Sequence, residues 1–126
     1  MEWTTEVGCA QTATIAVGTE SGETFAPTIQ LKDWAGNNLT VPAAIVCYVS
    51  NVATGLDVDT ISGEVALTGS GNGAVSTLLT HYAWLLISEA NGTISVTITD
   101  TGTGALYLVL VMPNGKLVVS DVMTYT

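Results

Sequence analysis

Residues 107–122 read YLVLVMPNGKLVVSDV and contain two apolar runs on either side of a turn. Pro113 fixes φ for the second position of a type I turn, Asn114 follows it, and Gly115 tolerates the positive φ of a G1 bulge. The flanking runs are therefore expected to pair as antiparallel strands. Because residues 108–112 are apolar in succession, instead of alternating with polar residues, both faces of the first strand are expected to be dry.

The composition of the chain predicts an all-β protein. Hydrophobic residues make up 48% of its 126 residues and charged residues only 10%, and there are 13 glycines. β-Branched residues, which favour strands, dominate the apolar segments. These segments are short and separated by frequent turn signals, which is typical of a β-sandwich. We predict an immunoglobulin-like Greek-key β-sandwich with an extended N-terminal arm, and a jelly roll is the alternative.

The first 24 residues differ from the rest of the chain. Residues 3–24, WTTEVGCAQTATIAVGTESGET, are small, polar and interrupted by glycine, with one weak strand signal at residues 14–17. We therefore predict an N-terminal arm or edge strand over residues 1–24 and a sandwich domain over residues 25–126. An arm of this kind gains order by adding a strand to an exposed sheet edge, which makes its apolar residues the predicted attachment residues: Trp3, Val7, Ile15 and Val17. The alternative is that the segment completes the domain's own sheet.

The alternation of apolar and polar residues predicts part of the core, and an Asn-Gly pair predicts a second turn. Residues 93–99, TISVTIT, place Ile94, Val96 and Ile98 on one face. The Asn-Gly pair before them favours left-handed backbone, so Gly92 is predicted to be turn-critical together with Asn114 and Gly115. The full predicted core is Ile45, Cys47, Val49, Leu85, Ile87, Ile94, Val96, Ile98, Leu108 and Leu110.

The charge of the chain excludes several classes of partner. Eleven acidic residues face only two basic ones, which gives a net charge of −9. Nucleic-acid binding depends on Lys and Arg, and an anionic membrane surface repels an acidic chain. The start of the chain has neither the basic region nor the apolar core of a secretory signal. We therefore expect no direct nucleic-acid or membrane contact, and synthesis in a cytoplasm.

Candidate chemical groups are few and scattered. His81 is the single histidine, and no G-x-S-x-G motif accompanies it. Asp57, Asp59 and Glu64 form the tightest group of acids, but the D-x-D-x-D-G pattern of a calcium loop is missing. Cys9 and Cys47 lie outside any metal-binding pattern. We predict no enzyme activity, no catalytic, cofactor-binding or metal-binding residue, and two reduced thiols, with a disulfide between them as the alternative.

Four segments together resemble a known group of proteins: TIQLKDWAGNNL (28–39), YVSNVATGL (48–56), LLISEANGTISVTIT (85–99) and YLVLVMPNGKLVVSDVMTY (107–125). They resemble virion structural proteins of tailed bacteriophages that carry an immunoglobulin-like β-sandwich. The resemblance covers residues 28–126, and no catalytic residues come with it. It implies a capsid decoration protein, of cement or head-fibre type, that is made in the bacterial host cytoplasm and forms a homo-oligomer on the major capsid protein shell of the phage particle. The alternative is a tail-associated or receptor-binding module.

This resemblance bears on the second dry face of the strand that opens the hairpin. If a neighbouring chain in the particle covers that face, Val109 and Val111 are interface residues. The alternative is that the strand lies at the centre of its own sheet, under a loop or the N-terminal arm, because central strands are often apolar on both faces.

Overall fold

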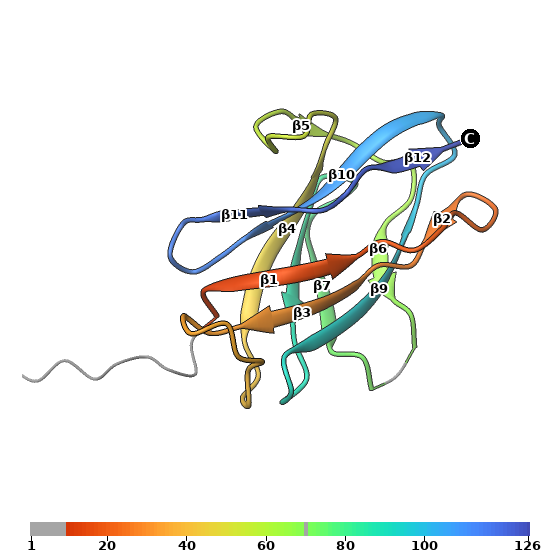
Figure 1. Ribbon diagram of the computed structural model, residues 1–126. Helices are drawn as coiled ribbons and strands as arrows, with labels where there is room; N and C mark the ends of the chain where they lie inside the picture. Colours follow the sequence, from red (N-terminus) through yellow and green to blue (C-terminus); the bar gives the residue numbers. More distant parts are fainter. Residues whose placement is uncertain (1–9, 70) are drawn as a thin grey trace, which may run out of the picture.

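The computed structural model describes residues 10–69 and 71–126, which form twelve strands and no helix. They are arranged as two antiparallel sheets (Figure 1). The first sheet has the order β1 (Thr12–Ala16), β3 (Thr28–Lys32), β9 (Thr93–Thr99) and β6 (Val65–Leu67), and the short β2 (Thr24–Phe25) also pairs with β9. The second has the order β11 (Leu117–Val119), β10 (Gly104–Val111), β4 (Ala44–Ser50), β8 (Ala83–Ile87) and β7 (Ala74–Leu79), with β12 (Met123–Tyr125) on β10 and β5 (Val58–Asp59) on β4.

The strand order is that of an immunoglobulin-like Greek key. Immunoglobulin domains pair strands A, B, E and D in one sheet and C, F and G in the other. Here β1, β3, β9 and β6 take the first four places, and β4, β10 and β11 take the other three. The β7–β8 hairpin extends the second sheet beside β4, although in the sequence it follows β6, a strand of the first sheet. The predicted all-β sandwich is therefore confirmed.

The core lies between the inner faces of the two sheets. Alternate residues of β9 are fully buried, as the alternation in its sequence predicts, and Leu108 and Leu110 of β10 are buried with them. One predicted strand orientation is wrong: Trp84 and Leu86 of β8 point into the core, whereas Leu85 is half-buried and Ile87 is 39% exposed on the outer face. Residues 84–87 are apolar without interruption, so the sequence of β8 does not specify which face is buried.

Three turns share one hydrogen-bond pattern, and they span residues 33–37, 89–93 and 112–116. In each, the N–H of the first residue donates to the carbonyl of the fifth, and the N–H of the fourth donates to the carbonyl of the first. The fourth residue is a glycine with φ between 80° and 83° in every case, namely Gly36, Gly92 and Gly115. The third turn has the backbone that was predicted for the hairpin after β10.

The N-terminal segment that the structure describes belongs to the sandwich. Every residue of β1 pairs with β3, from Thr12 opposite Lys32 to Ala16 opposite Thr28. Ala13 is buried, and Ile15 and Val17 pack against the core. Ile15 faces inward beside Ile29 of the same chain, which agrees with the alternative that this segment completes the domain's own sheet, and the attachment role of Ile15 and Val17 stays a prediction. The other two predicted attachment residues, Trp3 and Val7, lie outside the described residues.

Candidate interaction surface

The second face of β10 is covered at its centre by the chain's own loop. Val109 is completely buried. A Cβ atom built on Gly55 would lie 3.1 Å from Val109 and 3.0 Å from Val119, so residues 51–57 sit directly on this face. The Tyr48 hydroxyl donates a hydrogen bond of 2.5 Å to the Gly55 carbonyl and holds the loop there. Val109 is therefore a core residue of the domain and not an interface residue, which agrees with the alternative that this strand lies at the centre of its own sheet under a loop.

Beyond that loop, the outer face of the second sheet stays apolar and uncovered by the described residues. Cross-strand pairing sets Leu117, Val111, Val46 and Leu85 in one row across β11, β10, β4 and β8. All four are only half-buried. The next row ends at Ile87 opposite Ala44, both exposed. None of these positions carries a charge, and Val111 is the predicted interface residue that lies among them.

The outer face of the first sheet has the opposite character. Its outward positions carry hydroxyl and amide groups, for example Thr14 on β1, Gln30 on β3 and Thr97 on β9. A hydroxyl-rich face is well solvated, whereas an apolar sheet face in contact with water is unfavourable by roughly 25 cal/mol for each Å² left exposed. The two unlike faces therefore identify the second sheet as the candidate interaction surface.

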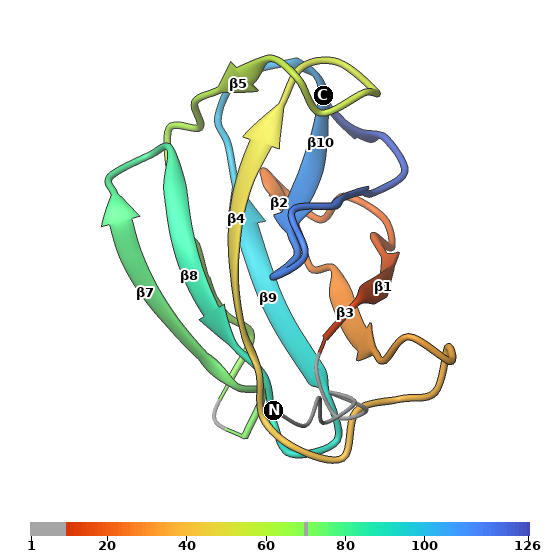
Figure 2. The ribbon, with the colours of Figure 1, turned by 90° about the vertical axis from the view of Figure 1, so that its left-hand side faces the viewer.

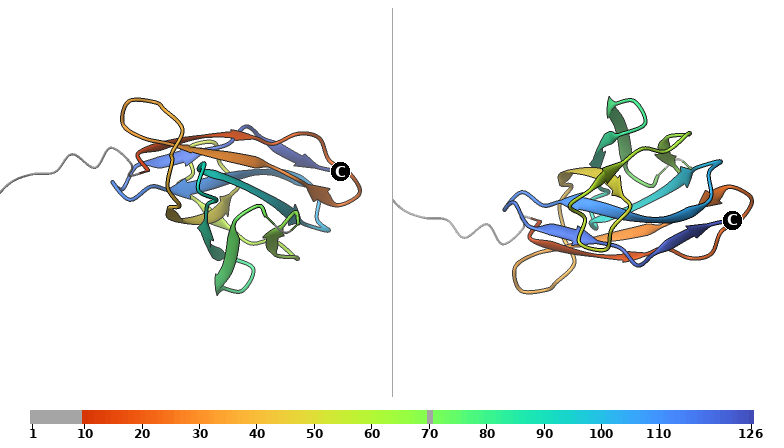
Figure 3. Two further views of the ribbon diagram at one scale, coloured as in Figure 1. Left: turned by 90° about the horizontal axis from the view of Figure 1, so that it is seen from below. Right: turned by 90° about the horizontal axis from the view of Figure 1, so that it is seen from above.

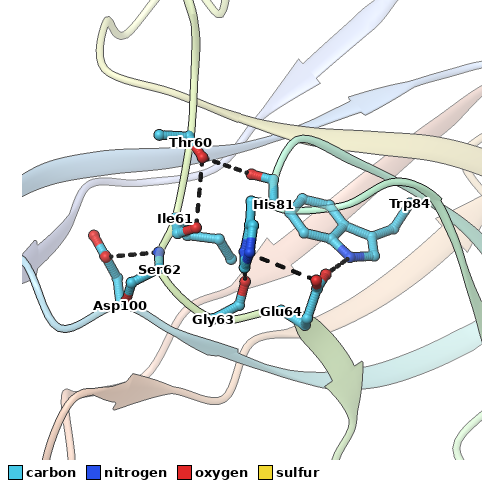
Figure 4. A network of polar contacts seen from close by, with 8 residues as sticks. All are labelled: Thr60, Ile61, Ser62, Gly63, Glu64, His81, Trp84 and Asp100. Atoms are coloured by element: carbon cyan, nitrogen blue, oxygen red, sulfur yellow. Dashed lines mark hydrogen bonds and ion pairs between the residues drawn. The ribbon is translucent and has the colours of Figure 1, made fainter.

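A polar cluster connects the residues just before β6 with β8 and the β7–β8 turn (Figure 4). Trp84 Nε1 donates to Glu64 Oε2 at 2.7 Å, and His81 Nδ1 lies 2.8 Å from the Gly63 carbonyl. Because a carbonyl only accepts, Nδ1 carries the proton in this contact. His81 Nδ1 is also 3.8 Å from Glu64 Oε1. Glu64 thus satisfies the indole of a fully buried tryptophan.

The hydrogen bonds of this cluster connect residues 60–64 with residues 81–84. His81 adopts φ 69°, and Thr60 and Ile61 both donate hydrogen bonds to its carbonyl. Among the described residues, no serine or threonine hydroxyl is hydrogen-bonded to its ring. Likewise, no group of three or more His, Cys, Asp or Glu residues in the described part could hold a metal ion; Asp57 is exposed, and an Asp59 oxygen accepts from the backbone of Thr60.

Two buried titratable groups have strongly shifted pKa values. Burial raises the pKa of the free Cys47 thiol to about 12. Burial, followed by the nearby charges of Asp100 and Glu20, also raises the pKa of Tyr125, whose hydroxyl donates to the Ile98 carbonyl. A thiol reacts as the thiolate, so Cys47 is inert at neutral pH. Cys9 lies outside the described residues.

The predicted turn residues differ in what surrounds them. A Cβ atom on Gly92 would lie 2.9 Å from the Leu31 carbonyl, whereas one on Gly115 would have open space around it. Asn114 accepts from the Lys116 N–H and donates to Gln11 Oε1, which connects this turn to the residue before β1. Glycine is thus required at position 92 both by the lack of space for a Cβ atom and by the positive φ, and at position 115 by the positive φ alone.

Comparison of the chain with protein-family models, with curated proteins and with solved structures finds no match. In the part of the chain that the structure describes, no helix has the length and hydrophobicity needed to span a membrane.

No strand was predicted over β7, which forms one edge of the second sheet (Figure 2). Its residues, AVSTLL, include a short alternation of apolar and hydroxyl residues between a glycine-rich loop and a turn. That alternation is the signal that could have indicated a strand. Its exposed leucines, Leu78 and Leu79, add to the apolar surface of the second sheet.

Proposed function

We propose that this protein is a structural component of a bacteriophage particle, of the capsid decoration type, that binds the major capsid protein shell. One observation carries the proposal: a domain with a complete core of its own leaves one sheet face apolar and uncharged. Val46, Leu85 and Val111 form the centre of that face. Apolar faces of this kind mark protein-protein contacts.

The sequence resemblance to phage virion proteins specifies the kind of contact. A decorating protein works by burying surface against capsid subunits and copies of itself, and it needs no reaction centre. The rigid sandwich supports this role, because strands hold a binding face more firmly than loops do. The outer face of the second sheet is the proposed contact with the shell, and the hydroxyl-rich face of the first sheet stays in solvent.

The alternative is a tail-associated or receptor-binding module. Copy number separates the two. In particles purified from the source lysate, a decoration protein is expected to stain nearly as strongly as the major capsid protein. A tail component is expected at a small fraction of that intensity. Absence from the particles would exclude both virion roles.

A pair of variants tests the face itself. Val111→Asp places a charge in the apolar row of the second sheet, and Thr97→Asp places the same charge on the hydroxyl-rich face of the first sheet. Both variants should fold, because neither position is fully buried. Val111→Asp is expected to lose binding to capsids that lack the protein, whereas Thr97→Asp keeps it. Equal binding by the two variants would exclude the second sheet as the contact.

A further inference from the structure

The β7 edge of the second sheet has no partner strand within the domain. β7 pairs with β8 on one side, and no strand of the described chain pairs with its other side (Figure 2). In an antiparallel pair, the backbone N–H and C=O groups of alternate residues point toward each neighbour. About half of the backbone groups of β7 therefore point into solvent, where they can receive another strand.

The other sheet edges are protected. β1 lies beside β11, and Asn114 Nδ2 donates to Gln11 Oε1 at 2.9 Å between the two sheets. The remaining edge strand of the first sheet, β6, has only three residues. Short or covered edges resist pairing with another chain. β7 has six residues, and although β6 lies beside it, no strand of the described chain pairs with its free edge.

β7 is also exposed on both of its faces. Val75 is its one residue that packs against the core, while Leu78 is 54% and Leu79 is 60% exposed. Figure 3 shows the β7–β8 hairpin projecting to one side of the two layers. An edge of this kind is normally blunted by a charged residue or a proline. Residues 65–88 contain no Asp, Glu, Lys, Arg or Pro, in a chain whose net charge is −9.

We propose that β7 pairs antiparallel with β7 of a second copy of this chain, which joins the two second sheets into one. The charge distribution favours a second copy as the occupant. Two copies with a charge of −9 repel each other wherever acidic surfaces meet, and the uncharged β7–β8 hairpin is a surface where they can approach. A partner of opposite charge would need acidic residues to bind, and β7 itself has none, while the adjacent carboxylates of Glu64 and Glu89 accept hydrogen bonds from Trp84 and from the Gly73 N–H.

Two-fold symmetry restricts the register of this pairing, and we place its centre at Ser76. A two-fold axis perpendicular to the sheet keeps corresponding residues on the same face, so directly opposite positions must have the same orientation. Centred on Ser76, the pairing sets Ser76 opposite its own counterpart and Val75 opposite Thr77. The irregularity between Thr77 and Leu79 limits regular pairing to the first part of β7. The apolar outer faces of both copies then lie on one side as a continuous surface.

The first test is molecular mass in solution, and it does not depend on the proposed function. Sedimentation of the full chain, which has a mass of 13.0 kDa, over about a hundredfold range of concentration should show a monomer–dimer equilibrium. Ser76→Glu places two carboxylates opposite each other and should raise the dimer Kd by up to about fivefold. Thr14→Glu adds the same charge to β1 at an equally exposed position, and should dimerise like the wild-type protein. A monomer at every concentration, or an equal effect of the two variants, would overturn the proposal.

Cross-linking tests the register. In a Cys9→Ser background, Ser76→Cys should form a covalent dimer under mild oxidation, because the two sulfur atoms would meet at the axis. Thr14→Cys is the matched control on β1 and should stay monomeric. Val75→Cys and Thr77→Cys should cross-link to each other when mixed and oxidised. If Ser76→Cys cross-links no more than Thr14→Cys, and the mixture gives no heterodimer, the two β7 strands do not pair.

Discussion

The hydrogen bond between the Glu64 carboxylate and the Trp84 indole can be tested with a single substitution. Trp84 is the largest fully buried side chain, and its one donor reaches Glu64 Oε2 at 2.7 Å. A buried donor that loses its partner retains its full desolvation cost. The carboxylate is therefore needed for stability because it accepts this hydrogen bond.

Glu64→Ala is expected to lower the free energy of unfolding by about 1–3 kcal/mol, because the Trp84 Nε1–H would be left without an acceptor. Glu64→Gln keeps a carbonyl oxygen at the same distance along the side chain, so it should lose much less. Urea unfolding followed by tryptophan fluorescence measures both variants. Equal losses of stability would mean that the negative charge of Glu64, and not its ability to accept a hydrogen bond, stabilises the contact with the indole.

Cys47 and Tyr125 make the fold sensitive to alkali. The pKa of Cys47 is raised from 9.0 to about 12 in the folded protein. Between these values the unfolded chain has lost the thiol proton and the folded chain has kept it, so the unfolded state binds fewer protons. Stability is therefore full below about pH 9 and falls as pH rises toward 12, by up to about 1.4 kcal/mol per pH unit. The raised pKa of Tyr125 acts in the same direction at higher pH.

The slope of stability against pH checks this prediction. Urea unfolding of the wild-type protein and of Cys47→Ala, each from about pH 8 to about pH 10, should show a shallower decline in the variant. The comparison uses slopes, so the constant loss caused by removing the buried sulfur does not affect it. Parallel slopes would show that Cys47 ionises equally in the folded and unfolded states.

At the scale of elements, the repeated turn connects strands through a glycine whose backbone only glycine adopts easily. Gly92 and Gly115 have nearly the same φ, 80° and 83°. Their surroundings differ, because a Cβ on Gly92 would lie 2.8 Å from Gln30 Nε2 and 2.9 Å from the Leu31 carbonyl. These two glycines therefore separate the cost of backbone conformation from the cost of a steric clash.

Gly115→Ala should lower the free energy of unfolding by about 1–2 kcal/mol, the ordinary cost of left-handed backbone for an L-residue. Gly92→Ala should lose clearly more, because the backbone of β3 must also move to make room. Gly115→Asn should be tolerated better than Gly115→Ala, since asparagine enters this conformation more readily. Thermal melts of the three variants measure the order. Equal losses in the two alanine variants would show that the space around Gly92 relaxes at no cost.

The sequence predicted those elements whose signals are local. The alternation in β9 and the Asn-Gly turns specify strand, face and register within a few residues. The orientation of β8 was not predictable, because residues 84–87 are apolar on both faces. The sequence also left open whether a loop or a neighbouring chain covers Val109, since residues 51–57 are distant from β10 in sequence. The candidate surface depends on both of these features, and only its Val111 was identified beforehand.

At the scale of the whole molecule, charge and apolar surface are segregated. Eleven acidic residues give a net charge of −9, yet residues 65–88 carry no charge. Association through β7 would therefore rest on backbone hydrogen bonds and apolar contacts. The charges contribute only long-range repulsion, which salt screens over a Debye length of about 10 Å at 0.1 M.

The dimer formed through β7 is accordingly expected to become stronger as salt is added. Its Kd should fall when sodium chloride is raised from about 0.02 M to about 0.3 M, because repulsion between the two acidic copies is screened while the uncharged contact is unchanged. Sedimentation equilibrium at several salt concentrations measures this dependence. Ser76→Glu should respond more steeply than the wild-type protein, since it brings two further carboxylates together at the axis. A Kd that rises with salt would instead require ion pairs between the copies, which the β7–β8 hairpin cannot supply, and the contact would have to lie elsewhere on the molecule.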